Sequence, residues 1–285
     1  MKKYRWSELP EPVREGIRER VGAITVCEEV KAGQSSNFTA VVHRDGAAPL
    51  FVKAVEGISP PMRWLRNEAG VGEPTSDIAP AVHFSADIED WLVVGFEYVR
   101  GRRAQLAPGS SDLALVAATL DRIGRLQAPG LRALEQRWQP TWWDRLGQER
   151  PEVIGRWNLD ELVAWERKVP ALVAGNSLLH TDLHPDQFLI ADDGEIRVID
   201  WGWPARGAAW VDPAFLVIRL IDAGHRVDEA ETWARRNTRW AEAGDEAITA
   251  FAVYVAGLWS YKAATTARLA RIARDYLGRR LPARE

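Results

Sequence analysis

The hydrophobic pattern of the chain changes near residue 99, and this change constrains the fold more than any other feature. Before it, apolar residues come in short strand-like runs, with Asp45-Gly46 as a hairpin signal between two of them. After it, they recur mostly at helical spacing. We therefore expect an α+β protein with a small antiparallel-sheet lobe at 1–98 and a larger, mainly helical lobe at 99–285. The strands expected in the first lobe are 24–30, 38–44, 49–55, 81–85 and 91–98.

Helices are expected in both lobes. In the first, apolar spacing predicts a helix that ends at Gly22, and prolines in a first turn predict another at 60–71. The helical stretches of the second lobe are 110–127, 140–148, 159–173 and 211–280, interrupted by a hairpin at 188–191 and 195–200. The residues of the first of these stretches that should face inward are Leu113, Leu115, Val116, Leu120, Ile123 and Leu126. Such a layout alone is compatible with many functions.

The composition excludes several classes of protein. Of the 285 residues, 46% are hydrophobic and 27% are charged, as in an ordinary globular protein. A formal net charge of −3 offers no basic surface for a nucleic acid. The single cysteine, Cys27, excludes an internal disulfide, and no apolar run approaches the length of a membrane span. The first ten residues lack the apolar stretch of a signal peptide. We therefore expect a soluble, cytoplasmic protein without nucleic-acid or membrane partners.

Residues with catalytic chemistry gather between His180 and Asp200. Asp182 falls in a predicted loop, where a carboxylate can orient an acceptor hydroxyl and take its proton. Asp200 ends an apolar strand, so its carboxylate projects from a rigid edge and can hold Mg²⁺ on phosphates. The amide oxygen of Gln187 is a further ligand of the kind that Mg²⁺ accepts. These residues supply the positioning and charge neutralisation that phosphoryl transfer needs most.

The same stretch resembles a known kinase pattern. The residues from His180 to Gln187, followed by Asp200-Trp201-Gly202, are similar to H-x-D-x-x-x-x-N and D-x-G. The chain most resembles the aminoglycoside phosphotransferase and choline kinase family, whose loop commonly reads H-G-D-L-H-P-x-N. The resemblance implies a bilobal protein-kinase-like fold that uses ATP and Mg²⁺ to phosphorylate a hydroxyl. It makes Asp182 the catalytic base, and Asp200 and Gln187 the metal ligands.

One departure and one rival interpretation accompany this pattern. The family has asparagine where this chain has Gln187, whose extra methylene leaves open whether one or two metal ions bind. The same replacement motivates a different class of protein, a pseudokinase that binds nucleotide without turnover. The rival interpretation takes His180, Asp182 and His184 as an H-x-D-x-H metal cluster of a hydrolase, which would need further ligands.

Lys53 stands in the middle of the apolar run Leu50–Val55, which resembles the kinase strand motif V-A-I-K. A cation in an apolar strand needs a counter-charge, and the α- and β-phosphates of a nucleotide would supply one. Of the 37 basic residues only 6 are lysines, so a lysine here indicates that a compact ammonium is required. Its predicted carboxylate partner is Glu68, with Glu73 as the alternative. The competing interpretation is a lysine on the exposed face of an edge strand.

Two further segments match nucleotide-binding parts of the family. The loop before the second strand holds the position of its phosphate-covering loop, although such residues also form ordinary turns. The end of the fifth strand resembles the kinase hinge, where one aromatic side chain backs the adenine and backbone groups bond the base. The residues placed at the nucleotide are Ser35, Ser36 and Asn37 in the loop and Phe96, Glu97 and Val99 at the hinge.

The acceptor is less constrained than the nucleotide. From residue 251 to the end, seven Lys or Arg residues stand against two Asp or Glu, which disfavours a polycationic aminoglycoside at this segment. A small hydroxylated metabolite or natural-product intermediate fits the sequence as well as an antibiotic does. A serine or threonine of a biosynthetic peptide is a further alternative. The preference between ATP and GTP stays open.

Asp212 and the tryptophans admit two interpretations each. Asp212 is expected either to cap the helix that begins there or, as the resemblance implies, to brace the catalytic loop through backbone amides. Most of the tryptophans are expected to fill the core, with an apolar wall for the acceptor as the alternative. Those considered for such a wall are Trp201, Trp203, Trp210, Trp233 and Trp259.

Overall fold

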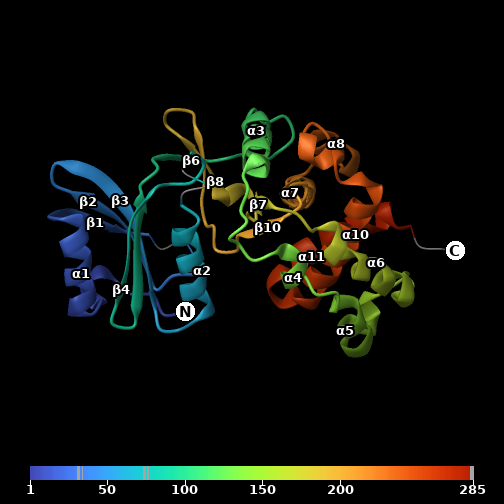
Figure 1. Ribbon diagram of the computed structural model, residues 1–285, viewed down its shortest axis with the longest axis horizontal. Coiled ribbons are helices and arrows are strands. Elements are labelled where there is room, and N and C mark those ends of the chain that lie inside the picture. The colour runs from blue at the N-terminus through green and yellow to red at the C-terminus, as the bar shows by residue number, and fades with distance from the viewer. Residues whose placement is uncertain (31–32, 34, 73–74, 76, 283–285) are drawn as a thin grey trace. The chain divides into compact units, whose positions relative to one another are not determined.

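The computed structural model describes residues 1–30, 33, 35–72, 75 and 77–282 (Figure 1). By their internal contacts they form two compact units, Met1–Arg103 with Asp186–Pro204 and Ala104–Pro185 with Ala205–Glu285. We call these the sheet unit and the helical unit. The division into functional lobes at residue 98 stays a prediction. No helix in the described ranges is long and apolar enough to cross a membrane.

The sheet unit is built on one antiparallel sheet in the order β1-β2-β3-β5-β4, which confirms the five predicted strands. Gly46, with a φ of 63°, makes the predicted tight turn between β2 and β3. Because β3 pairs with β2 on one side and β5 on the other, it is a central strand. The strands are β1 Ile24–Glu29, β2 Phe38–Arg44, β3 Ala47–Glu56, β4 Val82–Ile88 and β5 Trp91–Glu97.

A helix covers each face of this sheet, as Figure 1 shows. Helix α1 (Glu11–Val21) buries Val13 and Ile17 in a core that includes Leu50, Val52 and Trp91. Helix α2 (Pro60–Gly70) buries Leu65 in a second core with Val55, Leu92 and Val94. Side chains alternate between the faces of a strand, so the odd-numbered residues 51, 53 and 55 of β3 lie on the α2 side. The strand period therefore turns Lys53 toward α2.

A smaller sheet completes the sheet unit. It has the order β6-β8-β9 and contains the hairpin predicted around Asp193-Gly194, where Gly194 has a φ of 86°. A 3₁₀ turn, Pro185–Gln187, leads into β8. The strands are β6 Gly101–Arg103, β8 Phe188–Ala191 and β9 Ile196–Val198. This hairpin brings the segment before β8 next to the end of β9, because the Gln187 carbonyl accepts a hydrogen bond of 3.0 Å from the Ile199 amide.

The helical unit packs around α10, which is buried along most of its length. The sequence of a helix buried in this way is apolar on all sides and lacks the one-sided pattern of an amphipathic helix. The helices are α3 Asp112–Arg125, α4 Leu134–Arg137, α5 Trp142–Glu149, α6 Leu159–Leu172, α7 Val211–Asp222, α8 Val227–Ala234, α9 Thr238–Ala241, α10 Gly244–Tyr261 and α11 Ala263–Arg280. A two-stranded sheet of β7 (Ser177–Leu179) and β10 (Ala205–Gly207) joins them, and the sequence did not predict it.

One detail of α3 differs from the prediction. Leu115 is 40% exposed, whereas Val116, Leu120 and Ile123 are buried, so the buried stripe of α3 is narrower than expected. The stretch 211–280 is helical as predicted, and it is divided into the helices α7 to α11. The break after α7 coincides with Gly224, whose φ of 104° is typical of the residue that follows a helix end.

Candidate active site

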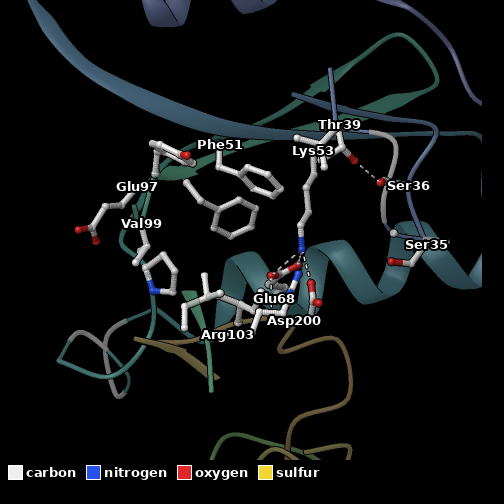
Figure 2. Close-up of a pocket in the computed structure, with 17 residues that line it drawn as sticks. Ser35, Ser36, Thr39, Phe51, Lys53, Glu68, Glu97, Val99, Arg103 and Asp200 are labelled. Carbon is white, nitrogen blue, oxygen red and sulfur yellow. Dashed lines mark hydrogen bonds and ion pairs between the residues drawn. The ribbon is translucent and has the colours of Figure 1, made fainter. Parts of the chain in front are cut away.

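A cavity of about 200 Å³ opens on the α2 side of the sheet unit (Figure 2). It is lined from β3, α2, the end of β5, the loop before β2 and the segment after β9. Most of the residues predicted to hold a nucleotide or its metal ion lie in this lining, although they come from distant parts of the chain. These residues are Ser35, Ser36, Lys53, Glu68, Phe96, Glu97, Val99 and Asp200.

Lys53 is the centre of the polar end of this cavity. Its Nζ donates to both carboxylate oxygens of Glu68, at 3.0 Å each, and to Oδ1 of Asp200 at 2.5 Å. Figure 2 shows the side chain reaching from the sheet toward these two carboxylates. The predicted ion pair with Glu68 is therefore present, and the alternative partner Glu73 lies outside the described residues. The interpretation of Lys53 as an exposed residue on an edge strand is wrong, because the side chain is 13% exposed and lies on a central strand.

The electrostatics of this group keep Lys53 charged. Burial by itself lowers the pKa of Lys53, but the carboxylates of Glu68 and Asp200 outweigh burial and raise the pKa above its usual value. Burial also raises the pKa of Glu68, although the ammonium of Lys53 opposes this change. Two carboxylates face one cation, so the group is well suited to recruit a further cation or to exchange partners when phosphates arrive.

The loop before β2 closes one side of the cavity. Ser36 Oγ and Thr39 Oγ1 lie 2.6 Å apart, so the hydroxyls of the loop and of β2 form one hydrogen-bonded pair at the lining. Lys3 Nζ donates to the carbonyls of Gly33 and Ser36, at 2.6 Å each, and so ties the loop to the N-terminal segment. The sequence did not single out Thr39 or Lys3. Ala32 and Gln34 of the predicted loop lie outside the described residues.

Asn37 has a different place from the one predicted. It does not belong to the cavity lining of the described chain. Its side-chain oxygen accepts from the Glu56 amide at 2.9 Å, and its side-chain nitrogen donates to the Lys2 carbonyl at 2.9 Å. Asn37 therefore links β3 to the N-terminal segment, and both ends of its amide group are engaged in that link. This placement does not favour a contact with phosphate.

The opposite end of the cavity is apolar. Phe51 and Phe96 lie on neighbouring strands and pair directly across β3 and β5. The Phe51 ring stands between Lys53 and the hinge in Figure 2. The Lys53 ammonium lies 5.8 Å from the centre of the Phe51 ring and 5.6 Å from that of the Phe96 ring. The Glu97 amide donates to the Ala81 carbonyl at 2.7 Å. A contact between Glu97 and a base would therefore use the Glu97 carbonyl rather than its amide.

Asp200 and Gln187 have the donor chemistry that Mg²⁺ requires. Asp200 is held at the end of β9 by its amide, which donates to Glu68 Oε1 at 3.1 Å, and its side chain is 47% exposed. Gln187 is 3% exposed, and its carbonyl is bonded to Ile199, the neighbour of Asp200. Both residues offer oxygen ligands from adjacent backbone segments. Mg²⁺ on a nucleotide needs only one or two protein carboxylates or amides besides the phosphates and waters, so this set fits the ion.

The predicted catalytic loop lies in the helical unit. Both oxygens of Asp212 accept from this loop, from the His180 amide at 2.7 Å and from the Thr181 amide at 2.9 Å. Asp212 stands in the first turn of α7, whose N-cap residue is Trp210. The bracing role is therefore present and the capping role is not. Burial raises the pKa of Asp212, and the bonded amides act against this rise.

Asp182 itself is half exposed, with 50% of its side chain accessible. Arg219 of α7 places Nη2 3.7 Å from Asp182 Oδ1. Arg137, at the end of α4, donates from Nη2 to Thr181 Oγ1 at 2.6 Å, and burial lowers the pKa of Arg137 to about 10. Sequence reasoning missed both arginines because they lie 37 and 44 residues from the loop positions they contact. In the sequence, each is a basic residue within an apolar helix or beside a tryptophan. That pattern is too common to identify either arginine as a functional residue.

Backbone conformation also marks both predicted motifs. Among the described residues, three that are not glycine have a positive φ: Glu89, Thr181 and Asp200, at 53°, 66° and 63°. Glu89 lies in the turn between β4 and β5. The other two lie beside the predicted base and at the predicted metal ligand. Such conformations persist where surrounding contacts hold them, as they do at many functional sites.

The structure does not support the hydrolase metal cluster, and it places most of the tryptophans considered for an acceptor wall in the core. In the described ranges, no three His, Cys, Asp or Glu side chains converge to hold a metal, so His180, Asp182 and His184 do not form a hydrolase cluster. Of the tryptophans considered for an acceptor wall, Trp203 is 37% exposed and packs beside Trp64 at 5.0 Å. The others are buried and belong to the core, namely Trp201, Trp210, Trp233 and Trp259.

The chain has the protein-kinase-like α+β fold, as solved structures of low sequence identity show. A thermostable mutant of aminoglycoside phosphotransferase APH(4)-Ia, in a ternary complex with AMP-PNP and hygromycin B, matches 96% of this chain over 100% of its own. The TM-score is 0.66 and the identity 14%. Choline kinase LicA from Streptococcus pneumoniae matches 95% of this chain over 98% of its own, with a TM-score of 0.61 and 16% identity.

A third structure, aminoglycoside-3'-phosphotransferase of type VIII, covers 86% of this chain and 98% of its own, with a TM-score of 0.56 and 20% identity. Neither a protein-family model nor a curated protein matches the chain. The predicted resemblance to aminoglycoside phosphotransferases and choline kinase is confirmed at the level of the fold.

Proposed function

We propose that the protein is a phosphotransferase that moves the γ-phosphoryl group of ATP to a hydroxyl of a small molecule. The observation that carries the proposal is the cavity of the sheet unit, in which Lys53 meets Glu68 and Asp200 at one end and two phenylalanine rings line the other. This arrangement suits a nucleotide, because the apolar end can take a base and the charged end its phosphates. The similar structures that contain AMP-PNP or ADP support the choice of nucleotide.

In this proposal, Lys53 binds the α- and β-phosphates, and Glu68 orients Lys53. Asp200 and Gln187 would hold Mg²⁺, which neutralises phosphate charge when it is bound. Asp182 accepts the proton of the acceptor hydroxyl as the acceptor oxygen bonds to the γ-phosphorus. The bond from that phosphorus to the bridging oxygen breaks, and ADP leaves. Asp212 holds the backbone that carries Asp182 through two amides. We place the activity in the cytoplasm, where ATP is available.

The proposal is tested by ATP consumption across a panel of hydroxylated compounds with the Asp182→Asn variant. Asparagine keeps the shape but accepts no proton. We expect turnover to fall by roughly two or more orders of magnitude, the usual scale for a positioned base, while ATP binding stays near that of the parent. Calorimetry provides the binding control. Equal turnover in variant and parent would show that Asp182 is not the base, and ATP binding without turnover on any acceptor would favour a pseudokinase.

A further inference from the structure

Arg219 has hydrogen-bond donors that the rest of the described chain leaves unused. Its closest carboxylate oxygen, on Asp182, is 3.7 Å from Nη2, which is within ion-pair range but too far for a hydrogen bond. Its Nε is buried and has no acceptor among the described residues. The side chain is only 13% exposed, and its guanidinium lies 5.4 Å from the ring centre of Trp259. The guanidinium of Arg219 is therefore fixed in place beside Asp182, the predicted base.

A mostly buried guanidinium with unfilled donors is costly, because burial removes the water that would otherwise accept its N–H bonds. Burial lowers the pKa of Arg219, and the carboxylates of Asp182 and Asp222 act against this change. Asp222 is already bonded to Arg268 at 2.5 Å. An incoming oxyanion would supply acceptors for the Nη donors, since a planar guanidinium fits carboxylate and phosphate groups with two parallel bonds.

The charges around the predicted catalytic loop also favour an anionic ligand. Arg137 and Arg219 contact it from two helices, and Asp182 is the carboxylate that faces Arg219. Asp212 uses both of its oxygens on the loop backbone. A polycation that approached Asp182 would therefore meet two fixed positive charges, which disfavours its binding. An acceptor with a negative group would be attracted by the same residues.

We propose that the acceptor is an anionic hydroxy compound, whose carboxylate or phosphate group is bound by Arg219 while its hydroxyl reaches Asp182. The short distance between the two side chains requires the anionic group to lie within a few bonds of the hydroxyl. This inference rests on the proposed function, because it takes Asp182 as the base. The inferred class of substrate is a hydroxy acid or a phosphorylated alcohol, and not a polycationic antibiotic.

The test is a titration of the whole protein with glycolate, with inorganic phosphate and with ethylene glycol, followed by calorimetry and without nucleotide. Glycolate and ethylene glycol differ mainly in the carboxylate. In Arg219→Gln, the dissociation constants for glycolate and phosphate should rise about tenfold or more, as expected for a lost charge-assisted bond. The matched control is Arg226→Gln, which removes an exposed arginine of the same unit and should behave as the parent. Ethylene glycol should bind no better to the parent than to either variant.

A second variant keeps the proposal testable if glutamine prevents folding. Arg219→Lys retains the positive charge beside Asp182 but replaces the planar fork by one ammonium, and it should still weaken phosphate binding several-fold. If the Arg219 variants bind both anions as tightly as the parent does, the proposal is overturned. The role left for Arg219 is then to balance the negative charge of Asp182. An equal loss in Arg226→Gln would overturn it too, because the anions would then bind the surface at large.

A turnover measurement separates this inference from the proposed function. A panel of hygromycin B, glycerol and glycerate covers a cationic, a neutral and an anionic acceptor. ATP consumption that depends on Asp182 but favours hygromycin B, unchanged in Arg219→Gln, would overturn the acceptor class and leave the phosphotransferase intact. A protein that fails to bind ATP would instead overturn the proposed function, whatever the anion titration shows.

Discussion

At the scale of single residues, Gln187 carries the departure of this chain from the loop it resembles. Its side chain is buried, and its carbonyl bond to Ile199 does not depend on the side chain, so the position can be varied without that link being lost. Gln187→Asn keeps an amide oxygen with a shorter reach. Gln187→Leu keeps similar bulk and removes the oxygen.

If the amide oxygen of Gln187 holds Mg²⁺, the two variants should differ. We expect Gln187→Leu to lower turnover by roughly tenfold to a hundredfold and to raise the Mg²⁺ concentration required, while Gln187→Asn keeps most of the activity. A Mg²⁺ titration of ATP consumption measures both effects, with thermal unfolding as the control for folding. A leucine variant that matches the parent throughout would remove Gln187 from the metal site.

At the scale of elements, α7 and the catalytic loop are joined through one buried carboxylate. In Asp212→Asn, one oxygen still accepts from an amide, but the side-chain nitrogen then faces the other amide as a second donor. We expect the free energy of unfolding to fall by about 2 kcal/mol, the scale of a lost buried bond to a charged group, and turnover to fall with it. Urea unfolding and ATP consumption measure these changes.

The control for this prediction is Asp228→Asn in the first turn of α8, where the carboxylate is exposed and bonded to Arg226. It should leave both stability and turnover near the parent values, since exposed ion pairs contribute little. ATP binding should also survive in Asp212→Asn, because the cavity of the sheet unit does not contain this residue. Parent-like stability of Asp212→Asn would show that the two amide bonds do not support the loop.

At the scale of the whole molecule, Glu166 should make stability depend on pH. It is fully buried in α6, and its oxygens accept from the amides of Trp142 and Trp143, at 3.2 and 3.3 Å. Burial raises the pKa of Glu166 to about 7, and the two amide bonds offset only part of this rise. The folded protein therefore binds a proton that the unfolded chain, with a glutamate pKa of about 4.3, releases.

Stability contributed by this group is present below pH 4 to 5 and is lost as the pH rises toward 7. Between pH 5 and pH 8 the free energy of unfolding should fall by about 2 kcal/mol more in the parent than in Glu166→Gln, which keeps an acceptor but does not titrate. Urea unfolding at both values measures the difference. Identical pH dependence in parent and variant would show that Glu166 is ionised in the folded protein throughout this range.

The sequence alone determined the elements and the loop that carries the predicted chemistry. The strand runs, the hairpin at Gly46 and the helix after Ser59 follow from local periodicity and from residues with restricted backbone angles, and the structure has them at nearly the predicted bounds. The partner of Lys53 was predicted because the resemblance supplied it, and the structure then showed the pair. The three-residue strands β7 and β10 went unpredicted, since so short a run carries no period.

The tertiary structure decided what surrounds each of these residues. It joined Asp200 to Lys53 across 147 positions, moved Asn37 to a structural link and brought Arg219 beside Asp182. A local pattern of apolar residues in the sequence predicts which face of a helix or strand is buried, because burial repeats with the backbone period. Contacts between distant residues depend instead on how those faces pack against one another, and the charges that meet in a cavity depend on that packing.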